Sequence, residues 1–475
     1  MVYIKWNCGR YKMKPLSKHL KVKLLDYSPK YNNLGPDAIL ATSGLLTTKL
    51  EDFDEALNKC DEKFIKIFHR ESTRRGHASL TTSVNFYFWI EGSKISDFYF
   101  SSFPFGSYII SSTRRIVFNE DSILIPEEIL NSEFREDYEK VCKELLSTYQ
   151  KLTKITTVDN ARKLLPLSII SNGFFNFTLQ TIIGSVKEIE RNSEKYPNEV
   201  KIILEMIKEE CLRKAREVTN AGLELFYDTS FDKQNIFNGE LENSDYVDEN
   251  DESIRFETIY MRKKFFDKIQ EFKDILENLK DIKEISNSWK DFVKRIREDI
   301  IFRVASSLSL ACITDLKRHR TMKQKFENIY DAIDRALLGS RDNFFFPPVE
   351  RELLDEIEEK YNKSLDLYQK MINNGISKNE AIYIIPLGLK LRFEIFLDGY
   401  HIFDPFGFIG VRSCTTADNE LVTFVNLIIN ELRDEGIPYE LLGPKCKLLV
   451  CPEKKFCSII KRFNANYNEE LHNKF

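Results

Sequence analysis

An internal repeat constrains the fold of this chain more than any other feature of its sequence. The segment "ARKLLPL" at 161–167 returns as "AIYIIPL" at 381–387, so that the two prolines lie 220 residues apart. Downstream, each copy has an Arg followed by a Glu eight residues later. These pairs are Arg191 with Glu199 and Arg412 with Glu420, at an offset of 221. Landmarks that recur in register indicate that one structural unit is built twice.

The order of predicted elements is also the same in the two copies. Apolar residues at helical spacing predict a helix over 134–152 and another over 354–372, each leading to a Pro-Leu segment. By the same offset, less a short gap, "LKRHRTMKQ" at 316–324 falls opposite "YFSSFPFGSYIISSTRR" at 99–115. We therefore expect an α+β protein made of two tandem copies of one unit, each a mixed sheet with packed helices.

An acidic stretch separates the two copies. The segment "ELENSDYVDENDESI" at 240–254 contains no basic residue and no regular periodicity, so it reads as a solvated linker. The predicted organisation is an N-terminal extension at 1–20, a first repeat at 21–235, a linker at 236–254, a second repeat at 255–440 and a Cys-containing tail at 441–475.

The composition excludes several classes of protein. With 70 Lys and Arg against 74 Asp and Glu, the chain has no global field that would favour nucleic acid or an anionic membrane. The sequence contains no signal-peptide pattern and no apolar run long enough for a membrane span, so a cytoplasmic location is expected. It has no GxGxxG motif, no P-loop and no recognisable catalytic triad.

Two short segments carry candidate anion-binding groups. In the first copy, Ser112 and Arg114 follow a segment rich in Ser and Gly, and a hydroxyl beside a guanidinium suits a phosphate. In the second copy, Arg318, His319 and Arg320 set two guanidinium groups around an imidazole, directly after an apolar element. The alternatives are an ordinary polar surface for the first segment and a solvated helix end for the second.

Three arginines lie inside or beside apolar stretches, at positions 162, 191 and 412. A guanidinium in such surroundings needs an anionic or carbonyl partner. The simplest candidates are Glu199 and Glu420, on the predicted helices that follow.

The C-terminal tail contains a group of cysteines. Cys446, Cys451 and Cys457 lie within twelve residues, with Cys414 and His472 as candidate fourth ligands for zinc. The spacings match no standard zinc pattern, and reduced structural cysteines are the alternative. Nine cysteines, an odd number, do not suggest a disulfide framework.

These segments together resemble the flavin-dependent thymidylate synthases. That family has the signature R-H-R-x-x-S-x-N-x-x-S-x-R-Y, preceded by G-H-x-S-x-x-E-H and followed by A-R-x-x-L-P and R-x4-A-Q-x-E. In this chain, "VKLLDYSPK" at 22–30 looks like the first strand of the family and "GHASLTTSVNFYFWIEG" at 76–92 looks like the G-H-x-S segment. "ARKLLPL" matches the A-R element, and "RSCTTADNE" at 412–420 matches the late element.

The signature is divided between the copies. The first copy has Ser102, Phe103 and Pro104 in place of R-H-R but keeps Ser107, Ser112 and Arg114. The second copy keeps Arg318, His319 and Arg320 but has Lys323, Lys325, Asn328 and Tyr330 where the remaining polar residues belong. Each copy therefore retains the half that the other has lost.

The resemblance implies reductive methylation of dUMP to dTMP, with FAD as cofactor and methylenetetrahydrofolate and NADPH as co-substrates. It implies a composite site shared between the repeats, and a homodimer that forms a pseudo-tetramer. By resemblance, Arg318, His319 and Arg320 face the flavin, and Ser112, Arg114 and Arg162 hold the nucleotide phosphate. The arginine that polarises the uracil ring corresponds to Arg191 or Arg412.

Several family positions carry other residues in this chain. The E-H pair is Thr82 and Ser83, the acidic residue before S-x-R is Ile110, and the glutamine before R-H-R is Asp315. A catalytically inactive relative, which keeps the scaffold to bind a nucleotide or flavin or to regulate a partner, is therefore the alternative to an enzyme.

Overall fold

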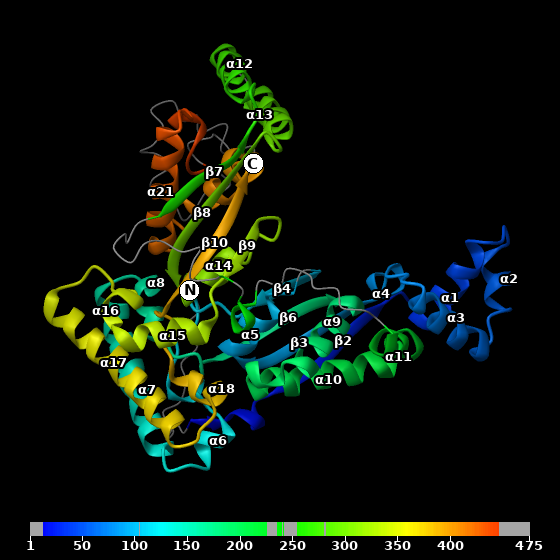
Figure 1. Ribbon diagram of the computed structural model, residues 1–475, viewed down its shortest axis with the longest axis horizontal. Helices are drawn as coiled ribbons and strands as arrows, with labels where there is room; N and C mark the ends of the chain where they lie inside the picture. The colour runs from blue at the N-terminus through cyan, green and yellow to red at the C-terminus, as the bar shows by residue number, and fades with distance from the viewer. Residues whose placement is uncertain are drawn as a thin grey trace. The chain divides into compact units, whose positions relative to one another are not determined.

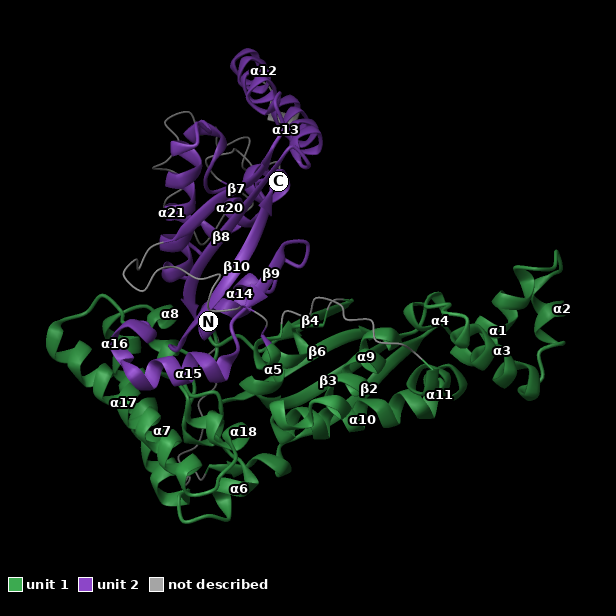
Figure 2. Cartoon of the chain, viewed as in Figure 1, with its two compact units in different colours: residues 1–238, 346–387 green, residues 239–345, 388–475 purple. Residues whose placement is uncertain are grey.

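The computed structural model describes residues 13–103, 105–225, 235–239, 241, 254–279 and 282–445 (Figure 1). The described part of the chain forms two compact units (Figure 2). Unit 1 comprises residues 1–238 and 346–387, and unit 2 comprises residues 239–345 and 388–475. Among the described helices, none is both long and apolar enough to cross a membrane.

Each unit is built around a four-stranded antiparallel sheet. In unit 1 the strand order is β2-β3-β6-β4, and in unit 2 it is β7-β8-β10-β9. The strands of the first sheet are β2 (Lys21–Ser28), β3 (Asn85–Ser93), β4 (Gly106–Ile110) and β6 (Ile170–Thr178). Those of the second are β7 (Arg255–Met261), β8 (Ile300–Ser309), β9 (Lys323–Phe326) and β10 (Lys390–Asp398). The shared topology confirms the predicted α+β duplication.

The helices of unit 1 cover one face of its sheet and form two further groups. They are α1 (Pro36–Leu46), α2 (Phe53–Leu57), α3 (Glu62–Arg74), α4 (Ser79–Thr82), α5 (Lys94–Phe100), α6 (Glu127–Leu130), α7 (Arg135–Ile155), α8 (Val158–Ala161), α9 (Leu179–Arg191), α10 (Asn198–Lys214), α11 (Arg216–Leu225), α17 (Arg351–Asn373) and α18 (Lys378–Ala381). A short pair of strands, β1 (Lys14–Pro15) and β5 (Leu124–Ile125), is parallel. Helices α5, α9 and α10 contact the sheet.

Unit 2 repeats this plan with its own helices around the second sheet. They are α12 (Phe265–Asn278), α13 (Ile282–Ile296), α14 (Leu310–Leu316), α15 (Ile329–Leu338), α16 (Ser340–Asn343), α19 (Gly399–Phe403), α20 (Phe408–Arg412) and α21 (Asn419–Asp434). Helices α14 and α21 both contact β8.

Strand alternation explains how the first sheet buries one face. In β3, Phe86, Phe88 and Ile90 are buried, whereas Tyr87 and Trp89 between them are not. Successive side chains of a strand point to opposite faces, so the sequence "FYFWI" sends its smooth apolar residues inward. Strand β6 follows the same alternation, and the two strands together give the sheet an aromatic core.

The compact units do not follow the copies of the sequence, because residues 346–387 of the second copy belong to unit 1. Helix α17 packs against α7, its counterpart in the first copy. Lys363 contacts Glu144 at 2.8 Å and Lys151 contacts Glu356 at 2.5 Å across this helix pair. The predicted helices over 134–152 and 354–372 are both confirmed, and they pack on one another.

The two Pro-Leu segments also pair inside unit 1. The Leu167 N–H donates to the Ile385 carbonyl at 2.9 Å, and the Leu387 N–H donates to the Leu165 carbonyl at 2.8 Å. At an offset of 220 these are the same two positions used in both directions, so the segments are related by a local two-fold. Unit 1 thus contains an intramolecular version of a symmetric contact between two identical chains.

The start of the predicted linker has regular structure. Residues Ile236–Asn238 form a 3₁₀ helix, and Ile236 and Phe237 are buried. The acidic residues 242–253 lie outside the described part of the chain.

Candidate functional site

The R-H-R segment forms a turn in unit 2 between α14 and β9. Helix α14 ends at Leu316, and Arg318 and Arg320 are exposed in the turn while His319 is half-buried. Arg318 contacts the Asp315 carboxylate at 3.4 Å, one helical turn earlier. The turn therefore presents guanidinium groups to solvent while its imidazole faces inward.

Arg412 lies against this imidazole. The Arg412 Nε–H donates to His319 Nε2 at 2.9 Å, and Nη2 donates to the Asp315 carbonyl at 2.8 Å. A third contact joins Arg412 Nη1 to the Asp315 carboxylate at 3.4 Å. Two predicted site residues that lie 93 positions apart are thus brought together within unit 2.

These contacts define the protonation state of His319. Burial is the largest cause that lowers the pKa of His319, to about 3, and the positive charge of Arg412 acts in the same direction. The ring is therefore neutral near pH 7. Because Nε2 accepts a hydrogen bond from Arg412, its proton resides on Nδ1. The Phe408 ring meets the imidazole edge-on at 5.1 Å between centroids.

The predicted phosphate-binding residues of the first copy form a second cluster, in unit 1. Arg114 Nη2 donates to Asp159 at 2.7 Å, and Arg162 Nη1 donates to the Thr113 hydroxyl at 3.0 Å. Arg162 Nε also lies 3.8 Å from Asp159. The Ser112 hydroxyl accepts a hydrogen bond from the Arg114 N–H at 3.3 Å. The structure brings Ser112, Arg114 and Arg162 together around a carboxylate.

The two late arginines have different surroundings. Arg191 is exposed at the C-terminal end of α9, whereas Arg412 is buried at the end of α20. Positions that match in the repeat therefore differ in access to solvent. A ligand in solution can reach the Arg191 guanidinium directly, whereas that of Arg412 is engaged by the protein.

Glu199 and Glu420 do not have the role expected from sequence. Arg162 pairs with Asp159, and Arg412 pairs with Asp315. The two glutamates instead bind the first residues of the helices that follow β3 and β8. Glu199 accepts from the N–H and hydroxyl of Ser93 at 2.6 and 2.5 Å, and Glu420 accepts from those of Ser309 at 2.7 and 2.6 Å. The repeated Glu thus caps a helix in each copy.

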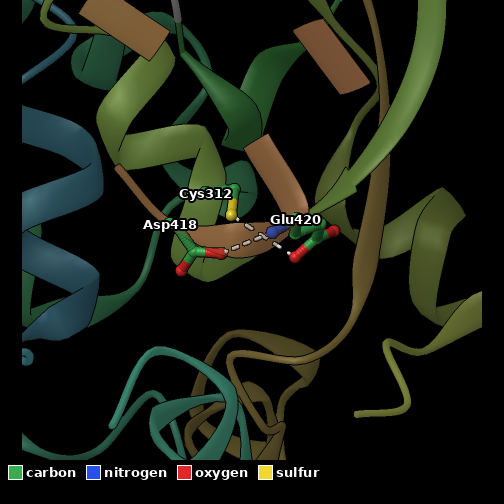
Figure 3. A group of neighbouring side chains, drawn as sticks. All are labelled: Cys312, Asp418 and Glu420. Atoms are coloured by element: carbon green, nitrogen blue, oxygen red, sulfur yellow. Dashed lines mark hydrogen bonds between the residues drawn. The ribbon is translucent and has the colours of Figure 1, made fainter. Parts of the chain in front are cut away.

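A buried group of potential metal ligands surrounds Glu420. Cys312, Asp418 and Glu420 have ligand atoms within 4.8 Å of one another (Figure 3). The Cys312 thiol donates to Glu420 at 3.3 Å, and the Asp418 carboxylate accepts from the Glu420 N–H at 3.0 Å (Figure 3). Because these groups bond to one another and to Ser309, their arrangement is that of a helix cap. The predicted zinc ligands Cys446, Cys451 and Cys457 lie outside the described residues.

Sequence reasoning missed the carboxylates that organise both arginine clusters. Asp159 precedes Arg162 by three positions, and Asp315 precedes Arg318 by three. On a helix this spacing brings the side chains together. The Asp-x-x-Arg pattern, present in both copies, was the available signal.

Comparison with known proteins agrees with the duplicated plan. The sequence profile of the family described as thymidylate synthase complementing protein matches residues 23–215 and again residues 244–436. The chain belongs to this family. Both copies match over most of their length, so the duplication covers more than half of the chain.

Individual relatives are distant. A flavin-dependent thymidylate synthase from Pyrococcus furiosus is 25% identical over 156 residues, which are 31% of this chain and 62% of the relative. The match thus spans less than two thirds of that relative. Among solved structures, a UMP/dUMP methylase PolB from Streptomyces cacaoi bound with 5-Br dUMP is 14% identical, with a TM-score of 0.36, covering 44% of this chain and 96% of that one. A second structure of it, with 5-Br UMP, is 13% identical with a TM-score of 0.34 and covers 46% and 98%.

Proposed function

We propose that this chain binds FAD and dUMP and catalyses the reductive methylation of dUMP to dTMP, with methylenetetrahydrofolate and NADPH as co-substrates. The observation that carries the proposal is the survival of complementary halves of one signature. Unit 2 presents Arg318, His319 and Arg320 in a turn braced by Arg412, and unit 1 gathers Ser112, Arg114 and Arg162. Random loss of an unused motif would not preserve one half in each copy.

The R-H-R turn has the donor set that a flavin nucleotide requires. Arg318 and Arg320 are exposed guanidinium groups, suited to the diphosphate. The His319 Nδ1–H is a neutral donor, suited to a carbonyl or nitrogen acceptor on the flavin. Bound flavin would supply the hydride for the reaction, and the protein's task is to hold it. Arg412 acts as a positioning residue, because it fixes the His319 ring and its tautomer.

The unit 1 cluster has the donor set for a phosphate monoester. Arg114 and Arg162 flank one carboxylate, Asp159, which orients both guanidinium groups. A phosphate dianion carries more charge than this carboxylate and would compete with it for the same donors. The Ser112 hydroxyl lies at the entrance of the same turn.

Arg191 is the better candidate for contact with the pyrimidine ring. Negative charge develops on the ring during methylation, and a guanidinium group stabilises it electrostatically. Arg191 is exposed, whereas Arg412 already donates to His319 and Asp315. The catalytic role that the family assigns to this position therefore falls to the first copy.

A non-catalytic scaffold is the second candidate, and one observation favours it. The arginines of both clusters are partnered by carboxylates of the protein, Arg114 by Asp159 and Arg412 by Asp315. Such internal compensation lowers the gain from binding an anion, because an existing ion pair must first be broken. A scaffold of this kind would bind the nucleotide or flavin weakly and without turnover.

Equilibrium binding of FAD to the full-length protein, followed by dUMP titration of the flavin absorption, tests the proposal. We expect bound flavin whose spectrum shifts with dUMP. Arg318→Ala should weaken FAD binding, and Arg114→Ala should abolish the dUMP shift. Arg115→Ala is the matched control, because this exposed neighbour of Arg114 should leave both signals unchanged. A protein that binds neither ligand would refute the proposal.

A further inference from the structure

A row of apolar side chains crosses the face of the first sheet that lies opposite its core. Trp89 on β3, Phe174 on β6 and Ile109 on β4 are direct cross-strand neighbours. Trp89 is 37% exposed and Ile109 is 75% exposed. We name these three residues the aromatic row. A contiguous apolar row open to solvent, on a sheet whose other face is buried, marks a binding surface.

The rings of the row are held in place by neighbours on the same face. The Trp89 indole N–H donates to the Glu91 carboxylate at 3.2 Å. The Tyr87 ring stacks on Phe174, with centroids 6.3 Å apart and planes 25° from parallel. The surface is therefore organised before any ligand arrives, which reduces the entropy lost on binding.

The dimensions of the row favour a large ring system. It crosses three strands, and neighbouring strands are about 4.8 Å apart, so the row extends over about 10 Å. This length suits a tricyclic ring and exceeds a single pyrimidine. Polar groups flank it: Ser107 and Asn176 face each other across the next position. Among the described residues, the buried Asn176 Oδ1 has no hydrogen-bond partner, so it is available to a ring N–H.

The second sheet has lost the corresponding surface. Its matching cross-strand pair is Ala305 with Glu394, in the same register as Trp89 with Phe174. Glu394 is 1% exposed and forms an ion pair with Arg303. A planar ring cannot stack on this charged pair. The aromatic row is therefore a property of the first copy, as the S-x-R segment is.

The row continues into the predicted phosphate cluster. Ile109 is near the end of β4, and the turn that carries Ser112 and Arg114 begins directly afterwards. An aromatic surface next to hydroxyl and guanidinium groups suits one molecule that has both a flat ring and a phosphate.

We propose that the aromatic row binds the isoalloxazine ring of a flavin nucleotide. The inference rests on the proposed function and specifies the surface of unit 1 that receives the ring. Stacking on aromatic side chains supplies the affinity, and Asn176 and Ser107 provide the polar contacts at the edge of the ring.

Tryptophan fluorescence of the full-length protein titrated with FAD tests the inference. The chain has three tryptophans; Trp289 is buried and donates to the Phe403 carbonyl at 2.7 Å, and Trp6 lies outside the described residues. The emission that Trp89→Phe removes is therefore the signal of the row. We expect FAD to quench that emission almost completely.

Variants of the row test the same contact through affinity. Phe174→Glu copies the residue of the second sheet and should raise the Kd for FAD at least tenfold. Ile109→Ser, at the most exposed position of the row, is a milder change that should weaken binding in the same direction. Ile67→Glu is the matched control, because this residue is exposed on α3, outside the sheet.

The outcomes separate the inference from the proposed function. If FAD binds but neither Trp89 emission nor the affinity of the row variants changes, the inference is wrong and flavin binding stands. If Phe174→Glu and Ile109→Ser change the sedimentation of the protein but not its FAD affinity, the row is a contact between copies and the inference is also wrong. Absence of FAD binding in the unmodified protein would refute both.

Discussion

Replacing Glu380 with Gln removes a buried acidic group from the segment of the second copy that docks into unit 1. Glu380 is 2% exposed, and its Oε1 accepts a hydrogen bond from the Asn198 N–H at 3.2 Å. Burial, together with the negative charges of Glu128 and Glu199, outweighs that hydrogen bond and raises the pKa of Glu380 from 4.5 to about 7. The counterpart in the first copy, 220 residues earlier, is the uncharged Asn160.

The sign of the effect follows from proton binding. Between pH 4.5 and 7 the folded protein holds a proton on Glu380 that the unfolded chain has released. The free energy of unfolding therefore falls as the pH rises through this window, and the contribution is constant above and below it. A tenfold change in the ionisation constant corresponds to about 1.4 kcal/mol, so the total loss is on the order of 3 kcal/mol. Glu380→Gln keeps an acceptor for Asn198 but cannot ionise.

Urea unfolding at pH 5 and at pH 8 measures this contribution. We expect Glu380→Gln to match the unmodified protein at pH 5 and to be more stable by about 2 to 3 kcal/mol at pH 8. Glu352→Gln, at an exposed position of α17, is the control and should leave the pH dependence unchanged. Equal destabilisation of Glu380→Gln at both pH values would refute the reasoning, because it would mean that the carboxylate stabilises the fold when ionised.

Three further predictions concern unit 2 and the repeated arginine. Arg412→Lys should reduce the free energy of unfolding by about 1 to 3 kcal/mol, because Asp315 and His319 lose hydrogen-bond partners, whereas Arg191→Lys should change it by less than about 0.5 kcal/mol; urea unfolding compares the two. Because the pKa of folded His319 is about 3, below its usual 6.5, the unfolded chain alone takes up a proton as the pH falls, and about 2 kcal/mol of stability is lost between pH 7 and 5; His319→Gln should show a correspondingly shallower slope, and an unchanged slope would contradict the neutral imidazole. Cys312→Ser should change stability by less than about 1 kcal/mol, and EDTA should not shift the Tm, because this group caps a helix; a Tm that falls with EDTA and recovers with zinc would instead indicate a metal site.

The repeat, the order of elements and the long helices were predictable because they depend on local pattern. A strand with alternating apolar residues and a helix with apolar residues at 3.6-residue spacing carry their signal in the sequence itself. Helices α7 and α17 therefore matched their predicted positions closely. The partner of an apolar face is a different question, since periodicity reports that a face is buried and not what covers it. The docking of residues 346–387 into unit 1 could not be read from the pattern.

The candidate residues were found by motif, but their interactions were not. Arg412 meets His319 across a sequence separation of 93 residues, a contact that only the tertiary fold creates. The sequence suggested Glu420 as the partner of Arg412, because both lie in the same repeated segment. In the fold, Glu420 faces the start of α14 and satisfies its first donors, since unpaired N–H groups at a helix start require an acceptor. Asp315 pairs with Arg412 instead.

The aromatic row illustrates the same limit. Its residues come from three strands that are far apart in the sequence, so no single segment revealed them. Their placement on one face follows from the register, in which Trp89 and Ile109 both pair with Phe174. Once the strand order is known, alternation alone assigns Tyr87 and Asn176 to that face.

Conversion of dUMP to dTMP by the purified full-length protein is the most direct test of the proposed function. The protein is supplied with FAD, methylenetetrahydrofolate and NADPH, and the nucleotide is analysed by mass spectrometry. We predict a product heavier by the added methyl group, lost in Arg318→Ala and Arg114→Ala and retained in Arg115→Ala. Protein that binds FAD and dUMP but forms no dTMP under these conditions would contradict the synthase activity and identify the chain as a nucleotide-binding scaffold.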